Sequence, residues 1–341
     1  MAFGDNSTII GPVSATVFNQ LATNRFISII RQASAMLNMA MGEREEGEDG
    51  PRFSQDENVS GARIEIPILG EARTITGVTD GAQERAAVTL TPISGMANAI
   101  TDVAHYPHTV PIENSLITRV QGGRLKAGSF FELVFQQLME SYLETFATAL
   151  NETGANKGPA QNRLGSWVAA VSDGVSAGES NYSDYYTFDR TDAANAGVRS
   201  TVIPEVGVLG LEDIATGQIA IQAKKGRADV GIAGVTVFGI VRQLVEQMTE
   251  GHVVNGRVDF SGAKFRYAGT DFMLEAHAPA ETLGLFDSRT WMTKQLQKNF
   301  TDSGIMPAPW LTASHVLPTE KWVGVFCKEP RKNAKLTGIT G

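Results

Sequence analysis

The chain has 341 residues, of which 42% are hydrophobic, and its formal net charge is −8 at pH 7. This length exceeds the size at which a single core stops growing, so we expect two lobes with extensions. The negative charge argues against a protein that wraps nucleic acid with its whole surface. The single Cys327 excludes intrachain disulfides, and no apolar run approaches the length that spans a membrane.

The N-terminal part of the sequence predicts an arm followed by a hinge. Apolar residues between Ala15 and Met41 follow helical spacing, which predicts a helix there. The segment Gly42–Pro51 then holds five acidic residues among glycines and a proline. Such a composition cannot pack into a core, so it indicates a solvated hinge.

The next segment predicts an extended β-hairpin. Residues 54–105 contain no aromatic residue, although about four would be expected from the aromatic content of the chain. Ala62–Leu69 alternates polar and apolar residues as a strand does, and Thr79–Ala82 is a turn signal between predicted strands at Thr74–Val78 and Ala86–Thr91. Aromatic and large aliphatic side chains supply most of the buried area of a core. This hairpin contains too few of them to form a core of its own.

We therefore expect the hairpin to lie on another copy of the chain. The predicted contact residues are Ile64, Ile66, Ile68, Arg73 and Arg85. Exposed ion pairs contribute little each, so apolar burial is expected to supply most of the stabilisation.

The longest helical pattern follows the hairpin. Apolar residues recur at helical spacing from about Leu125 to Asn151, which corresponds to a helix roughly 40 Å long at 1.5 Å per residue. Its aromatic residues predict a spine helix that buries one full face. The residues predicted to form this packed face are Phe131, Phe135, Tyr142 and Phe146.

Beyond Gly165 the sequence alternates helical and strand patterns, which predicts a mixed α/β lobe. Helices are predicted at Leu211–Lys224, with Gly226 after its C-terminal end, and at Gly234–Met248. Leu285–Phe300 is predicted to be partly helical. The predicted strands are Ser166–Val171, Asp229–Ala233, Val253–Val258, Lys264–Tyr267, Asp271–Glu275, Val316–Thr319 and Trp322–Lys328.

One pattern in the lobe is typical of enzymes. Gly174–Gly178 matches the G-x-S-x-G nucleophile elbow, which would make Ser176 the nucleophile of an α/β serine hydrolase. The elbow needs a strand before it and a helix directly after it, whereas Glu179–Asp184 is loop sequence. We interpret the pattern as an ordinary loop and keep the hydrolase as an alternative of another class, with triad partners among the downstream residues His252, His277 and His315.

Other chemical signals are weak. His105 and His108 are three residues apart, but Pro107 between them favours an extended segment, and no third metal ligand stands out. Gly231–Gly234 lacks the remaining residues of a phosphate-binding loop, so it indicates tight packing of a strand against a helix. The sequence therefore predicts no catalytic, cofactor-binding or metal-binding residue and no enzymatic activity.

The order of the parts resembles the major capsid protein of tailed bacteriophages, the family with the HK97 capsid fold. The resemblance covers most of the chain as a layout and is specific at several short stretches. These stretches are Tyr186–Asn195, Gly210–Asp213, Arg227–Leu244, Phe265–Asp271 and Leu285–Trp291.

The resemblance implies an α+β, HK97-like capsid fold with an N-terminal arm, an extended β-hairpin loop, a long spine helix and a mixed α/β axial lobe. The expected parts are the arm with its helix and hinge at 1–50, the hairpin loop at 51–110, a peripheral domain with the spine helix at 111–160, the axial domain at 161–310 and strands returning to the peripheral domain at 311–341.

The resemblance also implies a structural protein that assembles with itself into pentamers and hexamers of an icosahedral phage head around DNA, which it binds without sequence specificity. Assembly in the cytoplasm of a bacterial host, a final place in the virion capsid, and portal, scaffolding and decoration proteins as partners belong to the same expectation. No Lys–Asn crosslinking pair of that family can be matched here. An encapsulin-like compartment with the same fold is the nearest alternative. In either case we expect a chain without residues 58–104 to fold but not to assemble.

Overall fold

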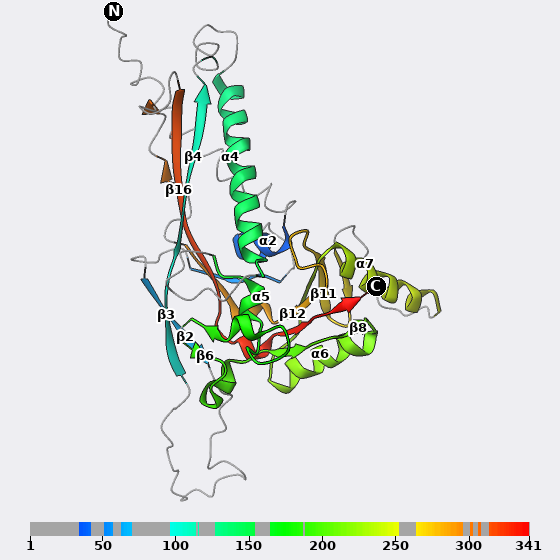
Figure 1. Cartoon of the computed structure of the whole chain (residues 1–341). Coiled ribbons are helices and arrows are strands. Elements are labelled where there is room, and N and C mark those ends of the chain that lie inside the picture. Colours follow the sequence, from blue (N-terminus) through cyan, green and yellow to red (C-terminus); the bar gives the residue numbers. More distant parts are fainter. Residues whose placement is uncertain are drawn as a thin grey trace, which may run out of the picture.

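The computed structural model describes most of the chain from residue 34 onward (Figure 1). The described residues are 34–41, 51–56, 63–69, 96–113, 115, 127–153, 164–186, 188–251, 264–295, 301–302, 306–307 and 314–340. Within these ranges no helix has both the length and the apolar character needed to cross a bilayer.

Helices of two kinds occur in the described ranges. The α-helices are α2 (Ala35–Met41), α4 (Ala127–Leu150), α5 (Trp167–Ala170), α6 (Leu211–Ala223) and α7 (Val235–Gly251). The short 3-10 helices are η1 (Ser180–Tyr182), η2 (Ala193–Val198), η3 (Ser288–Thr290) and η4 (Pro330–Lys332).

One six-stranded sheet, here called the spine sheet, lies against α4. Its strand order is β1-β13-β16-β14, and β4 and β15 also pair with β16. The long strand β16 pairs antiparallel with β4 from Ser314 and Glu113 to Val323 and Ala104. Figure 1 shows α4 running alongside these two strands. The strands are β1 (Ser54–Asp56), β4 (Ala104–Glu113), β13 (Trp291–Gln295), β14 (Thr301–Asp302), β15 (Met306–Pro307) and β16 (Ser314–Cys327).

A second six-stranded sheet, the lobe sheet, has the order β10-β11-β9-β12-β17-β7 and mixes parallel and antiparallel pairs. Glycine at position 217 lets α6 lie close to Leu285 and Leu336, and Phe238 of α7 contacts Phe265, so both helices cover the same face. The strands are β7 (Thr201–Ile203), β9 (Val230–Ala233), β10 (Lys264–Tyr267), β11 (Thr270–Leu274), β12 (Leu283–Phe286) and β17 (Ala334–Leu336).

The other face of the lobe sheet joins the core under α4. Phe286 packs on Trp167 of α5 with ring centroids 5.3 Å apart and on Trp291 of β13 at 5.4 Å. The chain crosses between the two sheets through short connections at two places, from β12 to β13 through η3 and from β16 to β17 through η4. The remaining strands form two-stranded pairs, which are β2 (Arg63–Leu69) with β3 (Met96–Asp102), β5 (Asp184–Tyr185) with β6 (Phe188–Asp189), and β8 (Gly207–Val208) with β18 (Ile339–Thr340).

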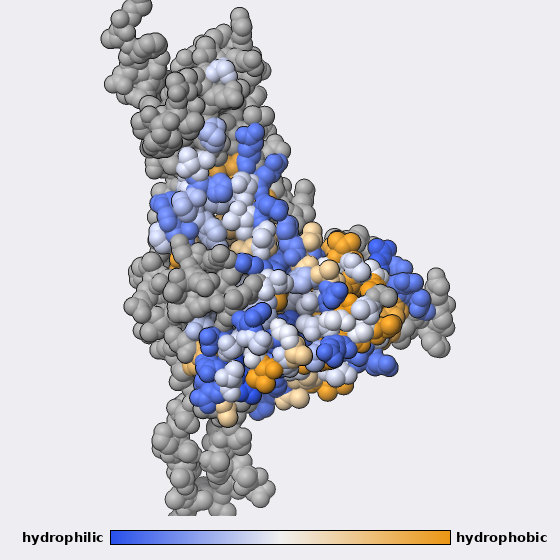
Figure 2. Space-filling model, in the orientation of Figure 1, coloured by the Kyte–Doolittle hydropathy of each residue, from blue (hydrophilic) through white to orange (hydrophobic). Residues whose placement is uncertain are grey.

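The lobe exposes most of the large hydrophobic side chains that are open to solvent in the described residues. In Figure 2 orange hydrophobic atoms gather on the right-hand side, over α6 and α7, whereas blue atoms dominate the visible side of α4. Val208, Ile219 and Val235 are 79%, 63% and 64% exposed. They stand on three different elements, and single exposed apolar side chains are common on protein surfaces.

Several predicted elements are confirmed, and the end of α6 differs in detail. The helices α4, α6 and α7 and the strands β9, β10 and β11 lie within one to three residues of their predicted bounds. At the end of α6 it is Lys225 that adopts the left-handed conformation, with φ 61°, while the N–H of Gly226 donates to Ile221 O at 3.0 Å. A Cβ at Gly226 would lie 2.8 Å from Ile221, so the glycine serves close approach rather than a positive φ.

Two predictions for the chain beyond Gly165 are wrong, and a third is confirmed in type but not in its division. Ser166–Val171 contains the helix α5 instead of a strand, because Ser166 caps it by accepting the N–H of Val168 at 3.2 Å. Leu285–Phe300 contains no α-helix in its described part but the end of β12, the 3-10 helix η3 and the strand β13. Both predicted closing strands are strand, but they belong to one continuous strand, β16 of the spine sheet.

Some predictions fall on residues outside the described ranges. These are the helix before α2, the hinge at Gly42–Gly50, the hairpin strands at Thr74–Val78 and Ala86–Thr91 and the strand at Val253–Val258.

Candidate assembly ribbon and the junction behind it

The first functional candidate is the ribbon, which we define as β2 and β3. Within the described part of the chain these strands pair only with each other, antiparallel, from Arg63 and Asp102 to Leu69 and Met96. A single residue, Val103, separates β3 from β4, so the ribbon is connected directly to the spine sheet. β2 also comes close to η2. A two-stranded ribbon is marginally stable by itself in water, so this one needs a surface to lie on.

The predicted contact residues divide between described and undescribed parts. Ile64, Ile66 and Ile68 occupy alternate positions of β2 and share one face of the ribbon. Their partners in register are Thr101, Ala99 and Ala97 of β3. Arg73 and Arg85 lie outside the described residues.

Val103 and Ala104 mark where the ribbon ends and the core begins. They are 1% and 0% exposed, and Val103 belongs to the core under α4. A deletion of residues 58–104 would therefore remove two core residues together with the ribbon. The boundary that separates ribbon from body lies at Asp102, two residues earlier than expected from the sequence.

The spine helix rests on β4 and β16 through aromatic rings. Tyr142 and Phe146 are fully buried, and Phe146 meets Tyr106 of β4 edge-on at 4.9 Å. The Tyr142 hydroxyl donates to Tyr106 O at 3.2 Å and lies 3.1 Å from Thr319 Oγ1 of β16. Burial raises the pKa of Tyr142 and the hydrogen bond to Thr319 lowers it, and the net result is a pKa of about 12.

Phe131 and Phe135 lie on α4, but their side chains are outside the described set. Asn151 follows the last residue of the helix, and its side-chain Nδ2 donates to Ala147 O at 2.8 Å. Its Oδ1 accepts a hydrogen bond from Trp167 Nε1 at 2.6 Å. The end of the spine is thereby tied to α5, which faces the lobe sheet.

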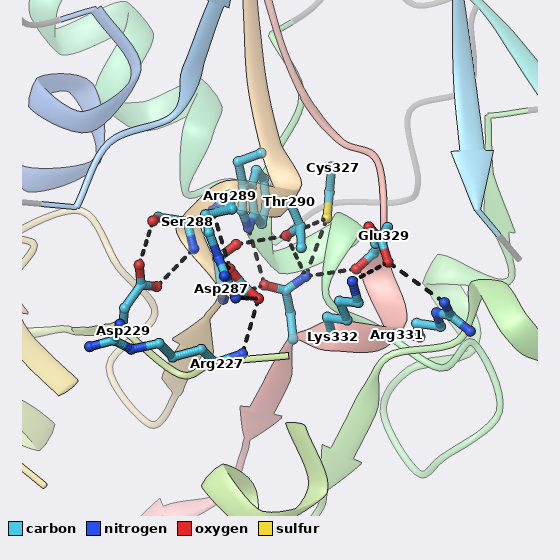
Figure 3. A network of polar contacts seen from close by, with 12 residues as sticks. Arg227, Asp229, Asp287, Ser288, Arg289, Thr290, Cys327, Glu329, Arg331 and Lys332 are labelled. Atoms are coloured by element: carbon cyan, nitrogen blue, oxygen red, sulfur yellow. Dashed lines mark hydrogen bonds and ion pairs between the residues drawn. The ribbon is translucent and has the colours of Figure 1, made fainter. Parts of the chain in front are cut away.

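The second candidate is the junction, the polar cluster that bonds to Asn333 where the chain crosses between the sheets. Figure 3 labels Asp287, Thr290, Cys327 and Glu329 of this cluster. Asn333 Oδ1 accepts the N–H of Asp287 at 3.1 Å and Trp291 Nε1 at 3.2 Å. Its Nδ2 donates to Thr290 Oγ1 at 3.2 Å, to Cys327 Sγ at 3.3 Å and to Glu329 O at 3.1 Å. One amide thus joins the crossover through η3 to the crossover through η4.

Asp287 completes the junction on its exposed side. Its carboxylate accepts both Arg289 Nε and Arg289 Nη2 at 2.8 Å and the backbone N–H of Arg227 at 3.0 Å. Burial alone would raise the pKa of Asp287, but these hydrogen bonds outweigh it and the pKa is lowered. Asp229 accepts the N–H of Ser288 at 2.8 Å and the Ser288 hydroxyl at 2.5 Å, but here burial outweighs the hydrogen bonds and the pKa of Asp229 is raised.

Buried charges fasten the loop that precedes η2. Lys335 Nζ, in β17, lies 2.7 Å from Glu179 Oε2 and donates to Val168 O at 3.0 Å, and both side chains of this ion pair are at most 5% exposed. Burial lowers the pKa of Lys335 in spite of Glu179. Arg190 donates to Ala169 O at 2.7 Å and Ala170 O at 2.6 Å, the last carbonyls of α5.

Ser176 does not have the surroundings of a catalytic serine. The helix α5 precedes it and the three-residue helix η1 follows it, so the strand–turn–helix context of a nucleophile elbow is absent from this described stretch. Its hydroxyl bonds to the carboxylate of Asp173, which also accepts the N–H groups of Val175 and Ser176 at 3.0 Å. The serine belongs to a local turn motif, as the loop interpretation expects.

The two neighbouring histidines do not converge. His105 and His108 lie on β4, where a spacing of three places them on opposite faces. His105 stacks on Trp322 at 4.1 Å, whereas His108 contacts Ser141 and Tyr142 of α4. No cluster of three metal-ligating side chains occurs in the described ranges. At Gly231 a Cβ would lie 2.6 Å from Phe272, so this glycine serves packing.

Sequence reasoning missed the residues of the junction and the buried ion pair. No sequence pattern around Asn333, Asp287 or Glu179 distinguishes these residues from polar residues on the surface. Lys335 did carry a signal, because it is a lone charge inside the apolar run of β17. A charge in such a strand is paired when it is buried, but the sequence does not name its partner.

Comparison with known proteins identifies the fold. No protein-family model matches the sequence, and no curated protein matches it either. Among solved structures, the capsid of cyanophage A-1(L) superposes with a TM-score of 0.60 at 11% identity, covering 91% of this chain and 93% of that chain. The capsid proteins of native and empty GTA particles follow with TM-scores of 0.56 and 0.53, at 10% and 11% identity. They cover 87% and 86% of this chain, and 96% and 98% of their own chains are matched. The expected α+β, HK97-like capsid fold is therefore confirmed.

Proposed function

We propose that this chain is a structural protein that assembles with copies of itself into a closed capsid. The observation that supports this most directly is the ribbon, a pair of strands that leaves the core at Val103 in a chain with a capsid fold. A chain that completes its burial on neighbours needs no larger core of its own. A non-enzymatic role accords with the local turn that holds Ser176.

The ribbon has a physical reason to lie on a neighbouring copy. Isoleucines alternate along β2 opposite small residues of β3, so one face of the ribbon carries apolar residues at every second position. Repeated heterologous contacts of this kind close into rings. We propose Ile64, Ile66 and Ile68 as contact residues, with Arg73 and Arg85 as charged partners further along the hairpin.

The finer expectations rest on the resemblance to phage capsid proteins. They are pentamers and hexamers of an icosahedral head, DNA inside it without base-specific contacts, and a place in the virion after assembly in a bacterial cytoplasm. The net charge of −8 suits a container from which DNA must leave again, since a strongly basic wall would retain it. Portal, scaffolding and decoration proteins are proposed partners on the same basis.

Negative-stain electron microscopy of the purified full chain tests this proposal. Rings or closed shells are the expected result, and nuclease-resistant DNA in particles from infected or producing cells would support a phage head. Shells filled with a cargo protein would instead favour an encapsulin-like compartment. A monodisperse monomer that hydrolyses esters, and loses that activity in Ser176→Ala, would overturn the capsid function.

A further inference from the structure

The turn after β11 connects the N-terminal helix α2, the lobe sheet and the spine helix. Glu275 follows the last residue of β11, and the N–H of Ala278 donates to Glu275 O at 3.1 Å, which closes the turn. His277 lies inside this turn. The two side chains point to different elements, Glu275 to α2 and His277 to α4.

Glu275 anchors the start of α2 with one of its two carboxylate oxygens. Its Oε2 accepts the Ser34 hydroxyl at 2.6 Å and the backbone N–H of Met36 at 3.1 Å. Ser34 Oγ in turn accepts the N–H of Leu37 at 3.2 Å. The side chain of Glu275 is 0% exposed. A carboxylate at the first turn of a helix satisfies free N–H groups and favours the helix dipole.

The other oxygen of Glu275 faces the His277 imidazole across a distance slightly longer than a hydrogen bond. Among the residues that the structure describes, neither Glu275 Oε1 nor His277 Nδ1 has a hydrogen-bond partner, although the two atoms are 3.6 Å apart. The opposite ring nitrogen, His277 Nε2, lies 3.1 Å from Glu144 Oε2 on α4. A neutral ring that donates from Nε2 to Glu144 turns the Nδ1 lone pair toward an ionised carboxylate.

One added proton resolves this mismatch. With both ring nitrogens protonated, His277 donates to Glu144 on one side and to the buried Glu275 on the other, as a charge-assisted bridge. Since α2 has no charged residue, the charged groups that contact the ring within the described part of the chain are these two carboxylates. Glu144 is 71% exposed and contributes little, whereas Glu275 is shielded from water.

We propose that His277 and Glu275 form a proton-operated clasp between α2, the lobe sheet and α4. The clasp exists when a proton bridges the two side chains and weakens when that proton leaves. A contact that requires a bound proton strengthens as the pH falls and is lost as the pH rises, and imidazoles exchange protons between pH 5 and 8. The attachment of α2 therefore tightens on mild acidification.

Hydrogen exchange of the α2 amides in the full chain tests the clasp, whether the chain is assembled or not, so its outcome is separate from that of the capsid proposal. Exchange corrected for the chemical rate is expected to be about tenfold slower at pH 6 than at pH 8 in the wild type. His277→Gln, which holds no such proton, is expected to lose this pH dependence.

Glu275→Gln supplies the decisive variant. Its oxygen can keep the bonds to Ser34 and Met36 while its amide donates to the neutral Nδ1, so protection of α2 is expected to be high at both pH values. His105→Gln is the matched control, because His105 pairs with Glu320 at 2.9 Å on the partly exposed side of β4. It is expected to keep the wild-type pH dependence.

Equal corrected exchange at pH 6 and pH 8 in the wild type would overturn the clasp. So would a pH dependence that survives in Glu275→Gln. If His277→Gln does not fold, Glu275→Gln and the wild type decide the question without it.

Discussion

The ribbon of β2 and β3 and the junction around Asn333 differ in where their groups find partners. In the ribbon Ile66 stands opposite Ala99, and among the residues that the structure describes the backbone of β2 and β3 pairs only between these two strands. In the junction the Asn333 oxygen accepts two hydrogen bonds, and its nitrogen lies within hydrogen-bond distance of four acceptors, all in the same chain. The junction thus bonds within the chain, whereas under the proposed function the ribbon is expected to bury its apolar face on another copy.

This difference separates folding from assembly within one chain. The junction and the buried pair of Lys335 and Glu179 fix how the two sheets and the intervening loop sit together, so substitutions there change the stability of the body. Substitutions in the ribbon are expected to leave the body unchanged and, under the proposed function, to change its assembly. The predictions below test that separation from the largest expected effect to the smallest.

Excision of the ribbon is expected to abolish assembly. Arg63 and Asp102 are directly paired, so replacing residues 64–101 with Asn-Gly closes a tight hairpin and keeps the buried Val103 and Ala104. The body should melt within a few degrees of the wild type by calorimetry, since the ribbon supplies little of its core, while electron microscopy shows no shells.

A milder variant serves as its control. Ile66→Asn keeps the strand and its length, so it should weaken shells without removing the ribbon. If the excised chain still forms shells, the ribbon is not needed for assembly. If its body unfolds, the ribbon belongs to the core.

Much of the fold was predictable from the sequence, because periodicity and composition report local burial. The spacing of Leu138, Tyr142 and Phe146 predicts the buried face of a helix. The missing aromatics in residues 54–105 predict a segment that cannot pack alone. Both features are properties of a stretch of chain, so neither needs knowledge of a distant partner.

The remaining features depend on distant partners and were not predictable. Trp167–Ala170 is buried throughout, and a short apolar run cannot be assigned to helix or strand by its period alone. The break predicted at Glu320 and Lys321 is absent because both residues pair with β4, a partner more than 200 residues earlier in the chain. Asn333 acquires its role from Asp287 and Cys327, and no local pattern reports that meeting.

The buried ion pair should give the largest change in stability. Lys335→Ala leaves Glu179 buried without its cation, and breaking such a pair costs about 3–5 kcal/mol of unfolding free energy. Urea denaturation measures the loss. Arg242→Ala, which removes the exposed pair of Arg242 with Glu246, should cost only about 0.3–0.5 kcal/mol.

The double variant Lys335→Met with Glu179→Leu sharpens the result. Replacing both charges by apolar groups of similar volume should recover most of the loss, because no unpaired charge remains. A double variant as unstable as Lys335→Ala would mean that packing, and not the unpaired charge, sets the cost.

Removing the central amide of the junction should come next. Asn333→Ala leaves the N–H groups of Asp287 and Trp291 without their acceptor, and each buried unsatisfied group costs about 1–3 kcal/mol. We expect a loss of about 2–4 kcal/mol in urea denaturation. Asn195→Ala, on a partly exposed residue that donates to Asp189 O at 2.9 Å, is the control and should stay within about 0.5 kcal/mol of the wild type.

The smallest effect concerns the hydroxyl under the spine helix, and it should depend on pH. Tyr142→Phe removes the bonds to Tyr106 O and Thr319 Oγ1, which costs about 1 kcal/mol near neutral pH. Because burial raises the pKa of Tyr142 to about 12, its stabilisation is complete below the ordinary value near 10 and is lost as the pH rises toward 12. The buried Tyr185 remains in both proteins and cancels from the difference. Urea denaturation from pH 8 to pH 11 should therefore show the gap between wild type and Tyr142→Phe narrowing with pH. A constant gap would mean that Tyr142 ionises as easily in the folded chain as in the unfolded one, which its full burial between α4, β4 and β16 opposes.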